Sequence, residues 1–180
     1  MKKLLWIIGI LIVLGFLSFL IADESIPRGE RGPEAEALAE KMMKAVGAEA
    51  WKKIPYVAWS FRGEHHYVWD KKNHIAQVEW DDYTAVIDLN KISGKAEKGG
   101  KLLEGEEASK TIRKAWSYWC NDSFWLNAPV KAMDPGTIRK IVREEDEMPK
   151  LLVQYETGGV TPGDAYLWIL DENYLPQAYK

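Results

Sequence analysis

Cysteine and histidine are scarce in this sequence, and their scarcity excludes several classes of site. The 180 residues include one cysteine, Cys120, and three histidines, His65, His66 and His74. One cysteine cannot form an intrachain disulfide or a cysteine-based metal cluster, and we expect it to be a buried, inert thiol. His65 and His66 are adjacent on a predicted strand and point to opposite faces, whereas zinc needs three or four converging ligands. We therefore predict no metal and no cofactor.

Sequence motifs of catalysis are missing as well. There is no G-x-S-x-G motif, no triad-like arrangement, no phosphate loop and no nucleotide fingerprint. Clustered acids at residues 81–82 and 144–147 lie in predicted turns, where carboxylates are usually solvated. Asp122 is either a buried structural carboxylate or a functional one, and we favour the structural role because a helix-to-strand corner needs such a residue. The sequence predicts no enzyme activity.

Basic charge is too scarce for a nucleic-acid-binding protein. The chain has 24 Lys and Arg against 27 Asp and Glu, a net charge of −3, whereas nucleic-acid recognition requires a basic footprint. Aromatic residues, in contrast, are abundant, with nine Trp and eight Tyr. Rings of this kind need a core or a ligand to cover them.

An uncharged apolar run from Leu4 to Ala22 follows Lys2 and Lys3. As a helix it would be about 28 Å long, enough for the hydrocarbon core of a bilayer. It is longer than the apolar region of a secretory signal and lacks a small-x-small cleavage site. We expect residues 1–24 to be an uncleaved signal-anchor in the inner membrane, with the N-terminus cytoplasmic and the remainder periplasmic. Cleavage and release into the periplasm is the alternative.

The pattern beyond the anchor predicts a tether over residues 25–32 and an envelope domain over residues 33–180. Helical spacing indicates helices at 33–46 and 48–54. From Tyr56 the apolar period changes to two, which predicts strands at 56–62, from after Gly63 to 70, at 75–80 and at 83–89. Connections this short allow only antiparallel neighbours. A weak edge strand and a loop are expected over residues 90–105.

The next stretch predicts an amphipathic helix with two tryptophans. Its apolar face holds Ala108, Ile112, Ala115, Trp116 and Trp119. Residues 121–123 are expected to end this helix, because short polar side chains favour turns, and residues 124–126 to form a short strand. Further strands are predicted at 137–143, 151–155, 165–170 and from 175. The fold class is mainly β (α+β), with an antiparallel sheet that covers the helices.

The large aromatic residues of these elements are the candidates for a ligand site. Two interpretations stay open: the rings fill the space between sheet and helices, or a strongly curved sheet leaves an apolar pocket for an acyl chain. The ten candidates are Trp59, Phe61, Tyr67, Trp69, Trp80, Trp116, Trp119, Phe124, Trp125 and Trp168, and Tyr166 belongs to the same aromatic excess.

Four short motifs accompany this order of elements: W-D-K at residues 69–71, N-D-S-F-W-L at 121–126, D-P-G at 134–136 and G-G-V-T-P-G-D at 158–164. In these motifs the chain resembles an uncharacterised Bacteroidetes-type envelope family, within or beside the LolA/LolB-like superfamily of lipoprotein carriers and receptors. The resemblance implies a strongly curved antiparallel half-barrel, helices on its concave side and a cavity able to hold lipid. It also implies further strands after residue 180, so that 33–180 would be a C-terminally truncated domain.

Together these features predict a membrane-anchored periplasmic domain that binds a lipid or acyl chain without catalysis. The alternative is an envelope scaffold in which every aromatic residue is core. Such a scaffold would recruit another envelope protein at an open sheet edge.

Overall fold

The computed structural model describes residues 26–145 and 148–180. The predicted anchor, from Leu4 to Ala22, lies outside these residues. Within the described part of the chain, no helix combines the length and the apolar character needed to cross a membrane. The helices are α2 (Pro33–Ala45), α3 (Ala48–Lys53), α4 (Gly105–Leu126) and the short 3-10 helix η1 (Ala128–Lys131).

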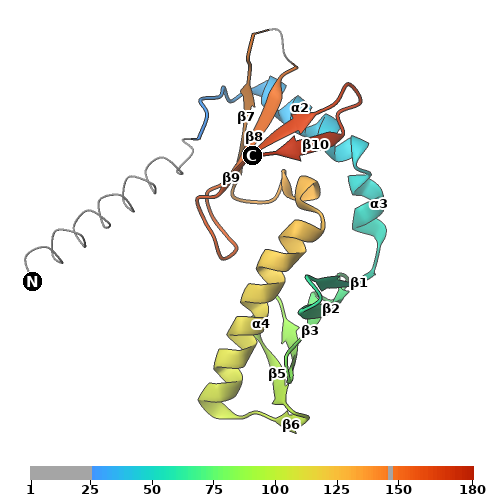
Figure 1. Ribbon diagram of the computed structural model, residues 1–180, viewed down its shortest axis with the longest axis vertical. Helices are drawn as coiled ribbons and strands as arrows, with labels where there is room; N and C mark the ends of the chain where they lie inside the picture. The colour runs from blue at the N-terminus through green and yellow to red at the C-terminus, as the bar shows by residue number, and fades with distance from the viewer. Residues whose placement is uncertain (1–25, 146–147) are drawn as a thin grey trace, which may run out of the picture.

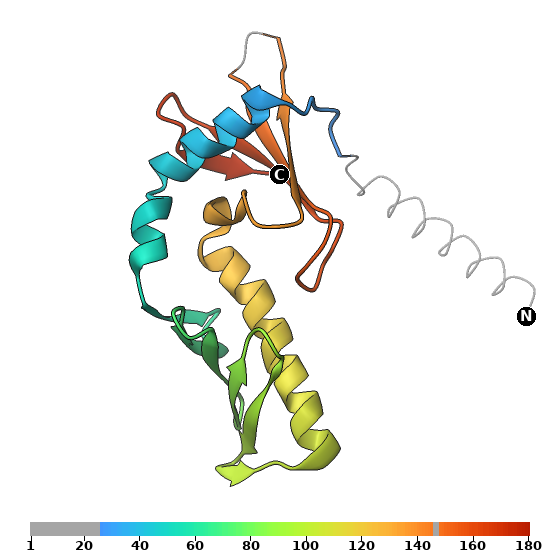
Figure 2. The same cartoon turned by 180° about the vertical axis from the view of Figure 1, so that it is seen from behind.

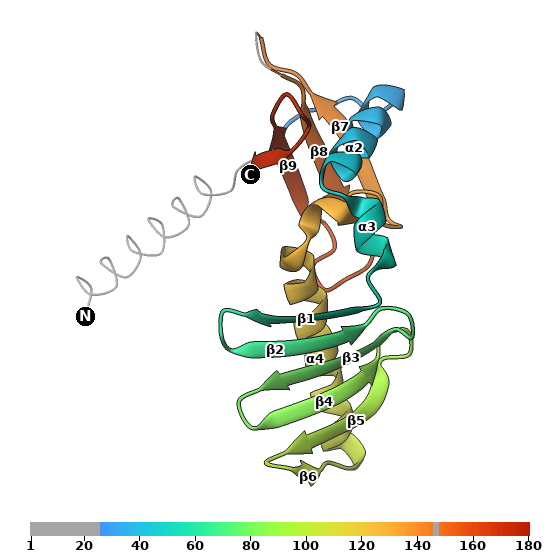
Figure 3. The same cartoon turned by 90° about the vertical axis from the view of Figure 1, so that its right-hand side faces the viewer.

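A six-stranded antiparallel meander follows α3 (Figure 3). The alternating pattern predicts its first four strands and a weak edge strand after them, whereas the sixth strand falls where a loop is expected. Its strands are β1 (Tyr56–Phe61), β2 (His65–Asp70), β3 (Ile75–Trp80), β4 (Tyr83–Asp88), β5 (Ser93–Lys98) and β6 (Lys101–Leu102). Every second side chain of β3 is buried: Ala76, Val78 and Trp80. The face formed by these residues is covered by α4.

The tryptophan-bearing face of α4 packs against this meander. Ile112 and Ala115 are buried in the shared hydrophobic cluster, and Trp116 and Trp119 lie partly buried against it. The predicted contact between the helix and the aromatic strands is therefore confirmed. Because α4 is amphipathic, one stripe of the helix is removed from water while the opposite side stays solvated.

The prediction that residues 121–123 end this helix is wrong, and so is the predicted strand over 124–126. The helix continues to Leu126. Asp122 and Ser123 are buried in it, and the carboxylate of Asp122 bonds to side chains of β2. A carboxylate that finds its partners on another element no longer competes with the helical backbone for hydrogen bonds. The helix ends only at Asn127.

A second, four-stranded antiparallel sheet lies at the other end of the molecule (Figures 1 and 2). Its strand order is β10 (Pro176–Tyr179), β9 (Ala165–Leu170), β8 (Lys150–Tyr155) and β7 (Thr137–Val142). Helix α2 buries Ala35, Leu38, Ala39 and Met42 against this sheet, and Ala128 of η1 and Ala132 directly after it belong to the same cluster.

The expectation of one strongly curved sheet with helices on its concave side is also wrong. The strands form two separate sheets, each with its own hydrophobic cluster, and α4 runs from one to the other. The mainly antiparallel α+β class is confirmed. The physical reason for the split is that α4 and η1 separate β6 from β7, and β7 then pairs with β8 instead of continuing the meander.

The alternation of faces along β4 gives a test of this arrangement. Replacing buried Ile87 by Ala should lower the free energy of unfolding by about 2–5 kcal/mol, because a cavity opens beneath α4. Replacing its neighbour Val86, which is 42% exposed, should cost less than about 1 kcal/mol. Urea denaturation followed by tryptophan fluorescence measures both. Equal losses would contradict the assignment of the two faces.

Candidate functional site

Nine of the ten aromatic candidates fall into two clusters rather than one pocket, and the tenth, Trp125, is exposed. Those packed between the meander and α4 are Trp59, Phe61, Tyr67, Trp69, Trp80, Trp116 and Trp119. Their rings contact one another, as in the stacked pair Trp59–Tyr67 with centroids 4.4 Å apart. Phe124 and Trp168 belong to the cluster of the four-stranded sheet. Most of the predicted ligand-binding residues are therefore packed in the two hydrophobic clusters, and the clefts lie beside these clusters.

One cleft, here called the aromatic cleft, lies between the C-terminal half of α4 and the loop that joins β8 to β9. It has a volume of about 430 Å³. Four of the predicted residues reach it, and the second sheet adds two tyrosines. The aromatic lining residues are Trp116, Trp119, Phe124, Trp125, Tyr155 and Tyr166. Glycines 158 and 159, both with positive φ, shape the loop on the opposite side, as glycine readily adopts this conformation.

Two polar atoms at this cleft are buried without a protein partner. The indole N–H of Trp119 and the hydroxyl of Tyr155 make no hydrogen bond within the described residues. Burial raises the pKa of Tyr155, so its hydroxyl stays protonated and able to donate at neutral pH. Buried donors without a partner carry a free-energy cost, and the indole N–H groups of Trp59, Trp69, Trp80 and Trp168 are buried in the same way.

Cys120 also lines the aromatic cleft. Burial raises the pKa of its thiol to about 11. Since the thiolate is the reactive form, the thiol is a weak nucleophile at neutral pH. Cys120 therefore forms part of the wall of the aromatic cleft.

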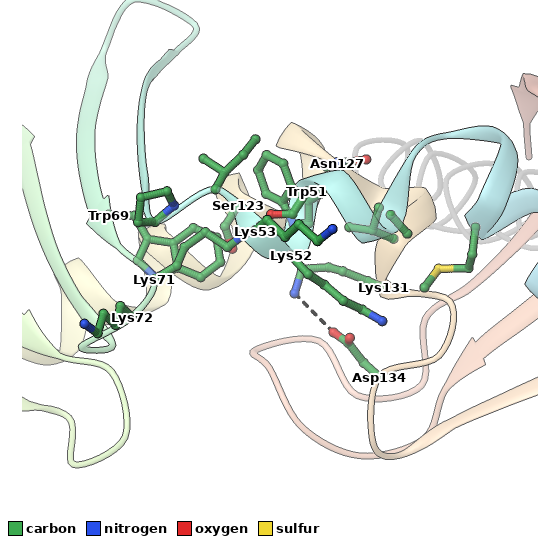
Figure 4. A pocket seen from close by; sticks show the side chains of 15 residues that line it. Trp51, Lys52, Lys53, Trp69, Lys71, Lys72, Ser123, Asn127, Lys131 and Asp134 are labelled. Carbon is green, nitrogen blue, oxygen red and sulfur yellow. Dashed lines mark hydrogen bonds and ion pairs between the residues drawn. The ribbon is translucent and has the colours of Figure 1, made fainter.

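A second cleft, here called the lysine cleft, lies between α3, the start of the β2–β3 turn and η1, and its volume is about 540 Å³ (Figure 4). Two tryptophans, Trp51 and Trp69, form part of its wall. Its charged lining residues are Lys52, Lys53, Lys71, Lys72, Lys131 and Asp134.

Lys71 holds the wall of this cleft together. Its ammonium group lies 4.2 Å from the ring centroid of Trp51 and 5.6 Å from that of Trp69, and it donates to the main-chain carbonyl of Trp51. Burial lowers the pKa of Lys71. The cation–π contacts and the hydrogen bond to the last turn of α3 attach this helix to the meander.

The two clefts meet at the C-terminal end of α4. Ser123, Lys131 and Asp134 line both of them. Trp69 on the lysine side contacts Trp119 on the aromatic side, edge to face, with ring centroids 5.1 Å apart. An apolar cleft and a basic cleft are therefore adjacent and share part of their walls.

Asp122 is the best-connected buried carboxylate of the described residues. Its Oδ2 accepts a hydrogen bond of 2.5 Å from the hydroxyl of Tyr67 and lies 2.7 Å from Nδ1 of His65. Its Oδ1 accepts from the side-chain amide of Asn121 at 2.8 Å. The network joins β2 to α4. The carboxylate therefore connects two elements of the fold, instead of supporting the helix-to-strand corner that the sequence predicts.

An Asp–His pair is also part of many catalytic sites, where the His activates a nucleophile. His65 borders a polar cleft of about 470 Å³, together with Glu64, Glu79 and Asp81. None of the residues that line this cleft is Ser, Thr or Cys, the residue types that an Asp–His pair activates as nucleophiles in such sites. Within the described ranges, no three His, Cys, Asp or Glu residues are placed to hold a metal ion.

Comparison with protein-family models, with curated proteins and with solved structures found no match for this chain. The assignment of function therefore depends on the geometry of the clefts themselves.

The lysine cleft is the part of the site that the sequence analysis missed. A signal for it exists, because both of its tryptophans precede a lysine pair, as W-K-K at residues 51–53 and W-D-K-K at 69–72. Lysines beside tryptophan suit cation–π contacts. The pattern does not reveal that residues 51–53 and 69–72 lie side by side, because their contact depends on the path of the chain from α3 to β1.

The buried Tyr67–Asp122 hydrogen bond gives a prediction about pH. Burial, followed by the bond to Asp122, raises the pKa of Tyr67. Above about pH 10 the unfolded chain therefore loses this proton while the folded chain keeps it. For each further pH unit the free energy of unfolding should then decrease by about 1.4 kcal/mol. Tyr67→Phe should remove this part of the alkaline loss and should cost about 1–3 kcal/mol at neutral pH. Urea denaturation between pH 7 and pH 11 measures both, and an unchanged alkaline slope would contradict the assignment.

Proposed function

We propose that this protein is a non-catalytic binding domain for a hydrophobic ligand, an acyl chain, that lies in the aromatic cleft. The observation that carries the proposal is the cleft beside α4, where aromatic side chains from the helix and from the second sheet surround about 430 Å³ of space. Ligand sites are typically clefts of about 300–1,000 Å³, lined by apolar and aromatic side chains with a few polar groups.

The exposed ring of Trp125 supports this proposal. Its side chain is 39% exposed although it contacts the rings of Phe124, Tyr166 and Tyr179. An aromatic ring at the mouth of an apolar cleft can remove its remaining surface from water by covering a ligand.

We place this domain on the periplasmic side of the inner membrane, held there by the helix predicted from Leu4 to Ala22. Signal cleavage and release into the periplasm is the alternative. The resemblance to the LolA/LolB-like carriers favours the same class of ligand. The expected half-barrel differs from the two sheets observed, so the proposal rests on the cleft and not on the fold. A tethered domain would hold or hand over its ligand rather than carry it across the periplasm.

Photo-crosslinking of the full chain in phosphatidylcholine nanodiscs tests this function. With diazirine-bearing palmitic acid, peptide mass spectrometry should find labels on residues 116–125 and 155–166. Trp125→Ala should reduce this labelling about tenfold, which corresponds to about 1.4 kcal/mol of lost apolar contact.

The control for this experiment is Tyr56→Ala. Tyr56 is a large aromatic residue, 61% exposed on β1, and it lines neither of the two clefts. This substitution should leave the labelling of the aromatic cleft unchanged. Labels confined to residues 1–25, or spread evenly over the meander, would show partition into the bilayer and would rule out the cleft as the binding site.

A further inference from the structure

We propose that the lysine cleft binds a phosphate group, and that this phosphate is the head group of the amphiphile whose acyl chain lies in the aromatic cleft. This inference rests on the proposed function and adds the chemical class of the ligand to it. It places a single-chain or glycerol phospholipid, rather than a fatty acid, in the two adjoining clefts.

The local charge is the first observation behind this inference. Five lysines line the cleft, and Asp134 is the one acidic residue among the described residues that line it. Even with Glu49, which pairs with Lys52 outside the lining at 2.7 Å, the net charge is +3. The chain as a whole carries −3. Positive charge gathered at one cleft of an acidic protein attracts anions to that place.

The partners of these lysines are the second observation. Lys71 is committed to the main chain of α3, and Lys131 pairs with Asp134 at 3.2 Å. The ammonium groups of Lys53 and Lys72 make no hydrogen bond or ion pair with any described residue. Figure 4 shows lysines of separate elements at the cleft, with Lys52 and Lys53 on α3 and Lys131 at the end of η1.

The residue type is one that binds phosphate. The guanidinium fork of arginine matches planar carboxylates and phosphates alike, and the ammonium group of lysine binds phosphate as a point charge. Five lysines and no arginine line this cleft among the described residues. A compact anion with several oxygen atoms can contact ammonium groups from different directions.

The shared wall connects the phosphate to the chain. Lys131 and Ser123 line both clefts, so a molecule with its phosphate beside Lys131 has the aromatic cleft next to it. The Ser123 hydroxyl bonds weakly to the main-chain carbonyl of Cys120, at 3.4 Å. A ligand oxygen at the junction would give this hydroxyl a better partner.

Two photoprobes that differ only in the head group test the inference. The full chain in dodecyl maltoside, a detergent without phosphate, is titrated with diazirine-bearing lysophosphatidic acid and with the monoacylglycerol of the same chain. We expect half-maximal labelling of residues 116–125 at a concentration at least tenfold lower for the phosphate probe.

Lysine variants show where this preference comes from. Lys52→Gln with Lys53→Gln should reduce the preference to about twofold and leave monoacylglycerol labelling unchanged. Both side chains are exposed on α3, so the fold tolerates the change. The matched control is Lys95→Gln with Lys101→Gln, which removes two exposed lysines of β5 and β6 outside both clefts and should keep the full preference.

The possible outcomes distinguish the phosphate site in the lysine cleft from the acyl-chain site in the aromatic cleft. Equal labelling by both probes, or a preference that survives Lys52→Gln with Lys53→Gln, would overturn the phosphate site and leave the acyl-chain site standing. No label on the aromatic cleft from either probe would overturn the proposed function itself. Inorganic phosphate should compete only above about 10 mM, since it lacks the apolar contacts; competition at micromolar concentration would identify free phosphate as the ligand and overturn the lipid assignment.

Discussion

The buried carboxylate of Asp122 fixes the contact on which both clefts depend. A carboxylate that is 2% exposed is strongly destabilising unless its oxygens are hydrogen-bonded, and Tyr67 and His65 of β2 supply those bonds. The last turns of α4 are thereby held against the near end of the meander. This contact sets Trp119 against Trp69 and brings Ser123 to the junction of the clefts.

Local patterns in the sequence predict the meander well, because each of its turns is short and every second residue of strands such as β3 is buried. They predict α4 only in part. The N-D-S turn signal at residues 121–123 is a weak preference of the backbone, and contacts with Tyr67 and His65, more than fifty residues away, override it. Propensity describes a segment alone, whereas the length of this helix is decided by tertiary contacts.

Neither the division into two sheets nor the lysine cleft can be predicted from the sequence, and the reason is the same for both. Period and turn length indicate a weak edge strand before α4 and a strand at β7, but not whether these strands pair across the helix between them. In the same way, the lysine pairs that follow Trp51 and Trp69 lie on α3 and after β2, and only the folded chain brings them together with Lys131. Of the aromatic candidates, the sequence identifies those of α4 that line the aromatic cleft, but it does not separate them from rings such as Trp59 and Trp80 that fill the core.

The energetics of the two clefts differ from those of the two cores, and this difference supports a binding role. The cores bury apolar side chains against each other and gain free energy from that burial alone. At the clefts, by contrast, lysines gather with a net positive charge and a tryptophan stays partly exposed. Both features are unfavourable in the free protein. A ligand with an apolar chain and an anionic head relieves both at once, because the chain covers the ring and the charge neutralises the lysines.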